Sequence, residues 1–426
     1  MTDARIPGAL PMSGIRVLEL GNYIAAPTAG RMLADFGAEV IKVERPDGGD
    51  ELRRWRLREG DTSLLYRTLN RNKKSITLDL RTEAGRKVAL DLAATCDVVL
   101  ENFRPGTLER WGLGPGDLTA AKPDLVLVRI SAYGQTGPYR DLPGFGAIAE
   151  AVGGLRQLTG DPDRLPVRTG VSLADTLAGI YAVAGAAMCL YRRERRRTAT
   201  ATPAEVASGL AAPAGGQLDL VDVALYEAIF SLTESLLPDY DAYRVERDRL
   251  GGRMEGVAPS NAYPCAGGRT VIIAGNGDSI FRRLMTAIGR PDLREDESLA
   301  SNDGRWSARE GLDEAIAAWT GTREVDEVVA VLEAAEVPVG RIYQADDIAA
   351  DPHYAERGMI QRLPVQVGSR ELADVAFPGV VPRIDGKSGT VRSLGPDLGA
   401  HTRDVLSDLL MLDASTIERL AAEGVI

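Results

Sequence analysis

The chain has 426 residues, of which 44% are hydrophobic and 26% are charged, and its formal net charge is −11 at pH 7. This length exceeds one ordinary hydrophobic core, so we expect a globular protein with two domains. The acidic balance disfavours non-specific nucleic-acid binding, which needs a basic face, although a few local arginines suffice to hold an anionic ligand.

The first half of the chain alternates short, branched strands with helices. We expect strands at 14–20, 39–44, 74–80, 97–102 and 124–134. Helices are expected at 27–38, at 82–96 with Thr82 as its cap, and from 172. Strands that alternate with helices are typical of a parallel sheet. We therefore expect a Rossmann-like, doubly wound α/β domain, with loops at the strand ends forming a crevice for a ligand.

The second half is organised differently. Residues 194–216 are rich in Arg, Ala, Thr, Pro and Gly, which indicates an exposed linker or insertion with little fixed structure. Arg195–Arg197 fit a solvated face, with a phosphate contact as the alternative. A strand that runs into a helix follows at 218–237. Further elements are expected at 270–276 (strand) and at 279–289, 308–319, 324–335 and 414–423 (helices).

These elements define the expected domain boundaries. We expect a large domain at 1–195, with 345–426 packing back on it, a linker with an insertion at 196–250, and a smaller α/β domain at 251–344.

The cysteines and the apolar segments indicate in which cellular compartment the protein is expected. Three cysteines are too few for a disulfide framework and fit a reducing cytoplasm, and Cys96 and Cys189 lie in apolar stretches that favour buried thiols. The N-terminus lacks the basic start and apolar core of a secretory signal, and no apolar run approaches the roughly 18–20 residues that span a bilayer. We therefore expect a cytoplasmic protein without a membrane partner.

Several cofactor classes are disfavoured by the motifs. The first strand is followed by Gly21-Asn22-Tyr23-Ile24-Ala25-Ala26, and Tyr23 occupies the place where a dinucleotide needs a second glycine for close backbone approach. No phosphate-binding P-loop motif occurs. The two histidines, His353 and His401, have no metal-ligand spacing. We expect no metal and no tightly bound cofactor.

One aspartate stands at the mouth of a long apolar helix, in "SLADTLAGIYAVAGAAMCLYRR" (172–193). Ser172 and Asp175 have the spacing of a capping box, in which the acidic side chain satisfies the backbone of the cap. The same position also suits a nucleophile, because the field at a helix start keeps a carboxylate ionised. The motif alone leaves both roles open, with capping the commoner use.

Longer blocks indicate a family. They occur in fixed order and cover nearly the whole chain except about 196–216: "VLELGNYIAAPTAGRMLADFGAEVIKVERPDGGD" (17–50), "NRNKKSITLDLRTEAGR" (70–86), "DVVLENFRPGTLERWGL" (97–113), "SAYGQTGPYRDLPGFGAIAEAVGGL" (131–155), "DPHYAERGM" (351–359) and "LGPDLGAHT" (394–402). Together they closely resemble the class III CoA-transferases, the group of formyl-CoA and carnitine CoA-transferases.

The resemblance implies an acyl-CoA:carboxylate CoA-transferase in which Asp175 is the catalytic residue. In this family the aspartate attacks the thioester, and an anhydride and then an aspartyl-CoA thioester form in turn. Coenzyme A is substrate and product, and the chains form interlocked homodimers. The 143–175 segment looks most like members that handle dicarboxylates, with succinyl-CoA as donor and a malate-, citramalate- or glutarate-like acid as acceptor.

The resemblance also implies contacts to CoA. The positions that match the family pattern are Tyr23, Ile24, Ala25, Arg45, Leu78, Arg81, Asn102, Phe103 and Arg110. Arginines suit the phosphates, and an exposed phenylalanine can cover adenine or the pantetheine arm. Lys73 and Lys74 are possible helpers, with a solvated turn as the alternative.

Other features of the acid site stay open. A second substrate carboxylate would need an arginine clamp, for which Arg53, Arg54, Arg156 and Arg168 are the candidates. Gly146 stands where many members carry an acidic residue, and Glu150 follows four residues later. The glycine-rich lid of the formyl-CoA branch is missing as a run, so 251–264 is the nearest candidate for a flexible cover.

Two alternatives remain at this point. The related α-methylacyl-CoA racemases carry a histidine base where this chain has Gly144-Phe145-Gly146, and phenylalanine cannot remove a proton. A catalytically silent CoA-binding protein would keep the pocket without turnover.

Overall fold

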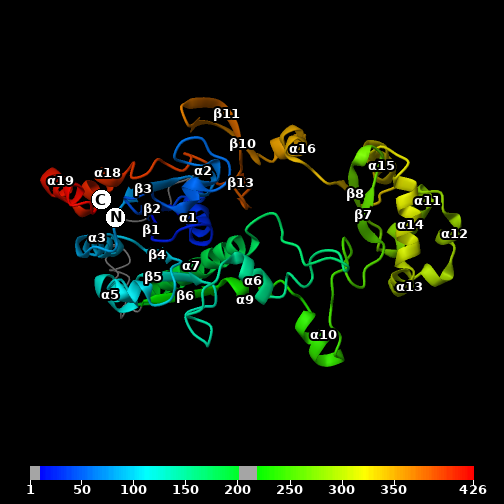
Figure 1. Cartoon of the computed structure of the whole chain (residues 1–426), viewed down its shortest axis with the longest axis horizontal. Helices are drawn as coiled ribbons and strands as arrows, with labels where there is room; N and C mark the ends of the chain where they lie inside the picture. The colour runs from blue at the N-terminus through cyan, green and yellow to red at the C-terminus, as the bar shows by residue number, and fades with distance from the viewer. Residues whose placement is uncertain (1–9, 201–217) are drawn as a thin grey trace. The chain divides into compact units, whose positions relative to one another are not determined.

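The computed structural model describes residues 10–200 and 218–426, and within them the chain forms two compact units. Unit 1 takes its described residues from 1–155, 169–234 and 353–426. Unit 2 consists of 156–168 and 235–352. Figure 1 labels the elements of both units.

Unit 1 is built on a six-stranded parallel sheet of order β3-β2-β1-β4-β5-β6. Its strands are β1 (Arg16–Glu19), β2 (Glu39–Glu44), β3 (Lys73–Thr77), β4 (Val98–Glu101), β5 (Val126–Ser131) and β6 (Asp219–Ala224). The central strand β1 pairs with β2 through Val17 and Val40 and with β4 through Val17 and Val98. Each strand predicted in the first half of the chain, and the strand that opens 218–237, is confirmed.

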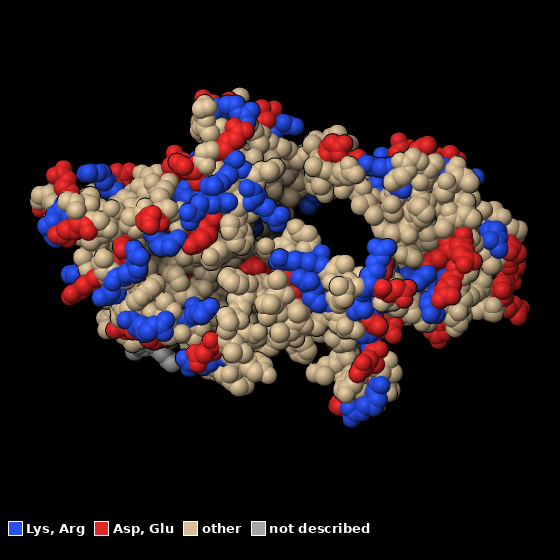
Figure 2. Space-filling view, viewed as in Figure 1, with Lys and Arg blue, Asp and Glu red and all other residues tan. Residues whose placement is uncertain are grey.

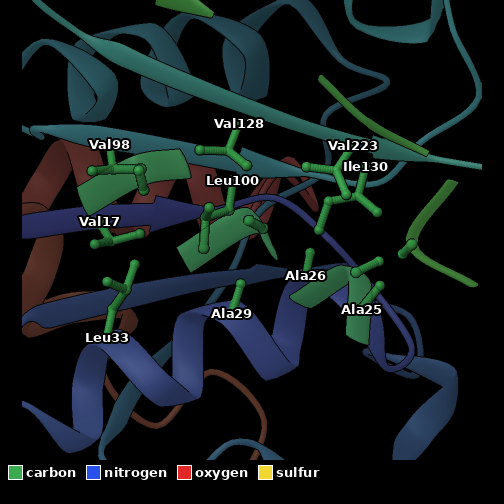
Figure 3. Close-up of a cluster of buried hydrophobic side chains, with 14 of the residues drawn as sticks. Val17, Ala25, Ala26, Ala29, Leu33, Val98, Leu100, Val128, Ile130 and Val223 are labelled. Atoms are coloured by element: carbon green, nitrogen blue, oxygen red, sulfur yellow. The ribbon is translucent and has the colours of Figure 1, made fainter. Parts of the chain in front are cut away.

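Helices cover both faces of this sheet. On one face α1 (Ala25–Asp35) and α7 (Leu173–Thr200) pack on the strands through small and branched side chains, part of which Figure 3 shows. On the other face lie α3 (Glu83–Ala94), α5 (Pro115–Ala121), α18 (Thr402–Leu410) and α19 (Ala414–Ala422). Thr82 caps α3 as predicted, since its Oγ1 accepts a hydrogen bond of 3.0 Å from the Gly85 N–H. The doubly wound architecture is therefore confirmed.

Helix α7 differs from the sequence expectation at its end. It continues to Thr200, so the start of the expected linker is helical, while 201–217 lies outside the described residues. Arg193 pairs with Asp97 and Arg197 pairs with Asp124, and these ion pairs hold the extended end against the sheet. The Arg195–Arg197 run is thus not simply a solvated face.

By length and composition, Leu173–Arg197 is also apolar enough to cross a bilayer, contrary to our expectation that no segment approaches this length. Its face of Ala174, Ala178, Ala182 and Ala186 is fully buried in the core of unit 1. This burial is what a core helix of a globular domain requires.

The C-terminal segment completes the sheet edge at β3. The Thr77 N–H donates to Thr402 Oγ1 at 3.0 Å, and the His401 N–H donates to the Ser75 carbonyl at 2.9 Å. These bonds satisfy backbone groups that an open edge strand would expose. The antiparallel hairpin of β10 (Ile360–Val367) and β11 (Arg370–Pro378) also belongs to unit 1. Its smaller elements are η1 (Glu51–Arg54), α2 (Leu64–Leu69), α4 (Thr107–Arg110), α6 (Gly146–Val152), α9 (Leu225–Phe230), β12 (Arg383–Ile384) and β13 (Lys387–Ser388).

Unit 2 has a three-stranded antiparallel sheet of β7 (Ser260–Pro264), β8 (Thr270–Ala274) and β9 (Val339–Arg341). It packs with α11 (Asp278–Ala287), α14 (Arg309–Thr320) and α15 (Val325–Ala334) in a separate core. These helices and β8 confirm the predicted elements. The remaining elements are α10 (Leu236–Tyr243), η2 (Ala266–Gly268), α12 (Pro291–Arg294), η3 (Glu297–Leu299), α13 (Asn302–Ser307), α16 (Ala345–Ala350) and, at the boundary, α17 (Pro352–Glu356). All three cysteines of the chain are buried and free.

Candidate active site

A cavity of about 180 Å³ opens in unit 1 where β1 to β4 end. Four of the residues predicted to contact CoA line it together, namely Arg45, Leu78, Arg81 and Phe103. The carboxyl ends of parallel strands are where doubly wound proteins bind their ligands. Leucines and Val43 form an apolar part of the wall, and Phe103 meets Trp111 edge to face with ring centroids 5.2 Å apart. An adenine ring fits such an apolar and aromatic wall.

The two arginines of this cavity are held by neighbouring acids. Arg45 Nη2 lies 2.6 Å from Glu51 Oε1, and Arg81 Nη2 lies 2.8 Å from Asp79 Oδ2. Both side chains are partly exposed, so each guanidinium keeps donors for a phosphate. Arg110 also lies near this end of the sheet but does not line the cavity, and its Nη2 donates to Thr107 Oγ1 at 2.9 Å. A contact between Arg110 and CoA stays a prediction.

The first loop, Gly21–Ile24, is fixed by side chains from elsewhere in unit 1. Asn102 Nδ2 donates to the Asn22 carbonyl at 2.7 Å, while Asn102 Oδ1 accepts from the Asn22 N–H at 2.8 Å. The Tyr23 N–H donates to Asp50 Oδ1 at 3.1 Å, and Tyr23 has a φ of 62°, in the left-handed region. Asn102 and Asp50 therefore hold the loop in a conformation that it would rarely adopt alone. Ile24 and Ala25, the other predicted loop contacts, are buried at the start of α1.

A buried charge network lies under this loop. Lys42 Nζ contacts Glu19 Oε1 at 3.0 Å, Asp50 Oδ2 at 2.9 Å and the Gly21 carbonyl at 2.7 Å. Lys73 Nζ contacts the other Glu19 oxygen at 2.7 Å. All four charged side chains are fully buried, so each depends on the others for compensation.

Burial alone would lower the pKa of Lys42, but the charges of Asp50, Glu19 and Glu44 outweigh it and raise the pKa. Burial and the neighbouring charge of Lys42 lower the pKa of Lys73 to about 8 despite the opposing charge of Glu19. Lys73 is therefore a structural cation of the core and not part of a solvated turn. Lys74 pairs with Glu39 at 2.7 Å on the half-exposed side of β3.

Asp175 lies in the first turn of α7, and its carboxylate rests against Gly146, the first residue of α6. A Cβ at position 146 would come within 3.2 Å of Asp175 Cγ and still closer to Oδ2. Any other side chain at position 146 would thus displace this carboxylate. Gly146, which the sequence presents only as a missing acid, is the residue that makes room for Asp175.

Aromatic contacts connect this position with the first loop. The ring of Tyr23 lies edge to face with Phe145, the residue before Gly146, at a centroid distance of 6.1 Å, and packs against Trp55 at 5.3 Å. The loop under the cavity and the start of α6 are therefore in direct contact within unit 1. Sequence reasoning missed Trp55 and the role of Phe145 as a wall, because nothing in the local pattern predicts which exposed aromatics meet.

The candidate clamp arginines differ in their surroundings. Arg53 is buried, and its Nη2 lies 2.7 Å from Glu44 Oε1 and 2.6 Å from the Tyr66 hydroxyl. Its charge is already compensated, so Arg53 is a poor clamp for a substrate. Arg54 is exposed, and Arg156 and Arg168 belong to the 156–168 segment of unit 2.

Two further expectations concern the acid site. Glu150, the acid that follows Gly146 in the sequence, is fully buried in α6. The segment considered as a flexible cover is loop only at 251–259, because 260–264 is strand β7, paired with β8 from Ser260 to Pro264. Backbone hydrogen bonds of that ladder fix the second half of the segment. Among the described residues, no group of three His, Cys, Asp or Glu side chains is arranged to hold a metal ion.

A parallel six-stranded sheet with helices on both faces and a cavity at the carboxyl ends of its strands defines a doubly wound α/β protein. Residues 12–402 match the model of CoA-transferase family III, and the chain belongs to this family. It is 43% identical over 417 residues to succinyl-CoA–D-citramalate CoA-transferase of Chloroflexus aurantiacus, covering 98% of both chains. It is 32% identical to succinate–glutarate CoA-transferase of Agrobacterium fabrum, covering 96% of this chain and 97% of that one.

A solved structure supports the fold. A CAIB/BAIF family protein from Brucella suis superposes with a TM-score of 0.79 at 31% identity, over 94% of this chain and 100% of that one. The family resemblance inferred from the sequence blocks is thereby confirmed.

Proposed function

We propose that this chain transfers CoA from succinyl-CoA to a free dicarboxylic acid and that Asp175 carries the transferred groups. The observation that supports this most directly is the position of Asp175 at the start of α7, against Gly146 and next to the aromatic contacts of the first loop. The names of the relatives, which include citramalate, malate and glutarate transferases, support a dicarboxylate acceptor. Coenzyme A is then substrate and product, with no tightly bound cofactor required.

The proposed reaction consists of four balanced acyl transfers. An Asp175 oxygen attacks the succinyl thioester carbon and the carbon–sulfur bond breaks. The CoA thiolate is the leaving group, and the product is an aspartyl-succinyl anhydride. The thiolate then attacks the aspartyl carbonyl, and succinate leaves with the bridging oxygen. The acceptor carboxylate attacks the resulting aspartyl-CoA thioester, the carbon–sulfur bond breaks, the CoA thiolate leaves, and a new anhydride remains. The thiolate finally attacks the acceptor carbonyl, which releases the new thioester and restores the Asp175 carboxylate.

The helix start supports this chemistry. Positive partial charge at the start of α7 favours the ionised carboxylate and stabilises anionic intermediates beside it. Arg45 and Arg81 bind the phosphates of CoA, and Phe103 covers its adenine or pantetheine part. Tyr23, Ile24, Ala25, Leu78 and Asn102 shape the backbone and the apolar wall of the same site, with Arg110 as a further phosphate contact.

We also propose that the active enzyme is an interlocked homodimer in the cytoplasm. The outer face of α7 leaves Met188 70% and Tyr191 67% exposed, and Tyr181 is exposed as well. Large apolar side chains gathered on one helix face favour a covering partner. Light scattering of the purified protein should give twice the chain mass, and a monomer at micromolar concentration would contradict the proposal.

The test of the reaction is intact-protein mass spectrometry after mixing with succinyl-CoA and quenching with hydroxylamine or borohydride. We expect a modification that maps to Asp175 and disappears in Asp175→Asn, together with exchange of label between succinyl-CoA and free succinate. An unmodified Asp175 across several acyl-CoA donors would contradict the mechanism. Uptake of solvent deuterium at the α-carbon of a 2-methylacyl-CoA would indicate a racemase, and tight CoA binding without either reaction would indicate a binding protein.

A further inference from the structure

A second cavity, of about 710 Å³, opens in unit 1 between the 48–62 loop, the turn of the β10–β11 hairpin and residues 397–398. It shares no lining residue with the cavity at the strand ends. Its volume lies in the range of small-molecule pockets, about 300–1,000 Å³.

The walls of this cavity are fixed by contacts between distant parts of unit 1. The Ser63 N–H donates to the Arg53 carbonyl at 2.8 Å and closes the base of the loop. The side chain of Arg370 in β11 pairs with Glu59 at the loop tip. A Cβ at Gly60 would lie 3.1 Å from Gly368 Cα, so the two backbones touch. The cavity therefore lies between the 48–62 loop and the β10–β11 hairpin, which are held together by these contacts.

The arginines around the cavity fall into two groups. Arg53 is compensated by Glu44, and its Nη1 donates to Thr62 Oγ1 at 3.1 Å, while Arg67 pairs with Asp397 at 2.7 Å. The charges of these two side chains are compensated by their own acidic partners. They leave little charge for a ligand.

Arg54 and Arg58 form the second group. Within 10–200 and 218–426, neither side chain has a hydrogen bond or an ion pair, although most arginines of this part of the chain have one. The guanidinium of Arg54 lies over Gly48, where a Cβ would be 3.6 Å from Nη1, so Arg54 covers this part of the wall at contact distance. Figure 2 shows Lys and Arg side chains gathered over the part of unit 1 that carries α2 and the hairpin in Figure 1.

Asp61 is the acid of this lining that has no partner among the described residues. The uncompensated side chains at the cavity are thus two guanidinium groups and one carboxylate. Two like charges that face one cavity attract an anion with two separated negative groups. A carboxylate beside them can accept a hydrogen bond from a hydroxyl group.

We propose that this cavity is a second binding site of the chain, separate from the CoA cavity, that takes a small dicarboxylate. Arg54 and Arg58 each donate to one carboxylate, in the two-pronged geometry that guanidinium and carboxylate share. Asp61 accepts a hydrogen bond from a hydroxyl group on the ligand. Malate and related hydroxy acids have this combination of groups.

Ligand binding at this cavity can be followed by the fluorescence of a neighbouring tryptophan. Trp55 follows Arg54 directly and is 41% exposed, and its ring lies against Tyr23 of the first loop. A ligand bound to Arg54 therefore changes the surroundings of the Trp55 ring. Because this ring packs against Tyr23, the change extends to the first loop. Binding can be followed without acyl-CoA, so the outcome does not depend on the proposed transfer reaction.

The experiment is a tryptophan-fluorescence titration of the full chain with L-malate, succinate and inorganic phosphate at constant ionic strength. We expect saturable binding of L-malate, a dissociation constant that rises about tenfold or more in the Arg54→Gln, Arg58→Gln double variant, and a signal that disappears in Trp55→Phe. Arg56→Gln is the matched control, since Arg56 is exposed on the same loop but does not line the cavity, and its dissociation constant should equal that of the wild type.

Asp61→Asn provides a second variant that keeps the size of the side chain. It should weaken L-malate binding more than succinate binding. Equal dissociation constants in the wild type and the double arginine variant would overturn the proposal. Phosphate that binds more tightly than both dicarboxylates would also overturn it, because the site would then belong to phosphate esters.

Discussion

The carboxylate of Asp175 and the Cα of Gly146 are in direct contact, at the point where α7 and α6 begin. This contact makes a side chain at position 146 incompatible with the observed position of the carboxylate. Because the backbone of Gly146 has a negative φ, an alanine there is strained only by this contact and not by its own conformation.

Gly146→Ala should therefore displace the Asp175 carboxylate and lower kcat by about 100-fold, the loss that a shift of about 1 Å in a reacting group produces. Stability should change little, because the carboxylate is only half-buried. Steady-state kinetics with succinyl-CoA and thermal unfolding of the same samples check both statements.

Gly170→Ala is the matched control for this variant. Gly170 lies five residues before Asp175, and a Cβ at this position would have no other atom within 4 Å. The control variant should keep wild-type activity. Full activity of Gly146→Ala would show that the nucleophile is not the carboxylate at this position.

Arg81 is expected to contribute to CoA binding rather than to the acyl transfer. Arg81→Gln removes one charge-assisted hydrogen bond to a phosphate and should raise the KM for succinyl-CoA about tenfold at unchanged kcat. Measuring KM for succinyl-CoA and for its 3′-dephospho form identifies the phosphate. If Arg81 binds the 3′-phosphate, wild type and variant should have the same KM for the dephospho substrate.

Lys87→Gln serves as the control for charge, since Lys87 is exposed on α3 and pairs only with Asp91 in the same helix. An equal rise of KM in both variants would mean that the general field of this surface, and not a contact at the cavity, attracts CoA.

Lys42 is expected to be essential for the stability of unit 1. Lys42→Met keeps the length of the side chain but leaves Glu19 and Asp50 buried without this partner, which should cost about 3–5 kcal/mol in the free energy of unfolding. Because Asp50 also accepts the Tyr23 N–H, the variant should raise KM for succinyl-CoA as well. Urea unfolding and kinetics of the same preparation measure both effects.

Lys74→Met is the control on the neighbouring strand, where the Lys74–Glu39 pair is partly exposed. It should cost no more than about 1 kcal/mol. In the double variant Lys42→Met, Asp50→Asn, part of the stability should return, because one uncompensated charge is gone. No gain in the double variant would argue against Asp50 as the main partner of Lys42.

Much of this fold could be predicted from the sequence because the parallel strands are short, branched and bounded by polar loops. The strand at Glu39–Glu44 has the predicted limits, and Thr82 caps α3 as its spacing indicates. The end of α7 could not be predicted, since it depends on ion pairs with Asp97 and Asp124, which lie far away in the sequence. The local composition at the end of α7 favours a loop, but these tertiary ion pairs favour the helix.

Only part of the candidate site is connected to the sequence pattern. The family pattern gathers Arg45, Leu78, Arg81 and Phe103, and the structure brings these four to one cavity. The position of Asp175 depends on Gly146 because the first turns of α7 and α6 are in contact. The sequence pattern of either helix alone does not predict this contact. Lys42 did carry a signal, because a lysine between Ile41 and Val43 in a strand buried on both faces needs buried partners.

Glu44 should make the protein sensitive to acid. Burial alone would raise the pKa of this carboxyl, but hydrogen bonds from Arg53 and Ser75 and the charge of Lys42 outweigh it and lower the pKa to about 2. A group whose pKa is lower in the folded state stabilises the fold above its unfolded pKa and loses that contribution as the pH falls towards the folded pKa. For Glu44 the contribution is fully present above about pH 4.5 and is lost between about pH 4.5 and pH 2.

The shift corresponds to about 3 kcal/mol of unfolding free energy. Urea unfolding at a series of pH values between 7 and 2.5 should show this loss in the wild type. Glu44→Gln should be less stable at pH 7 and should have a flatter dependence in the acid range, because the titrating group is absent. Glu423→Gln, at an exposed pair with Arg419, should follow the wild-type curve. An unchanged acid slope in Glu44→Gln would contradict the assignment of this acid sensitivity to Glu44.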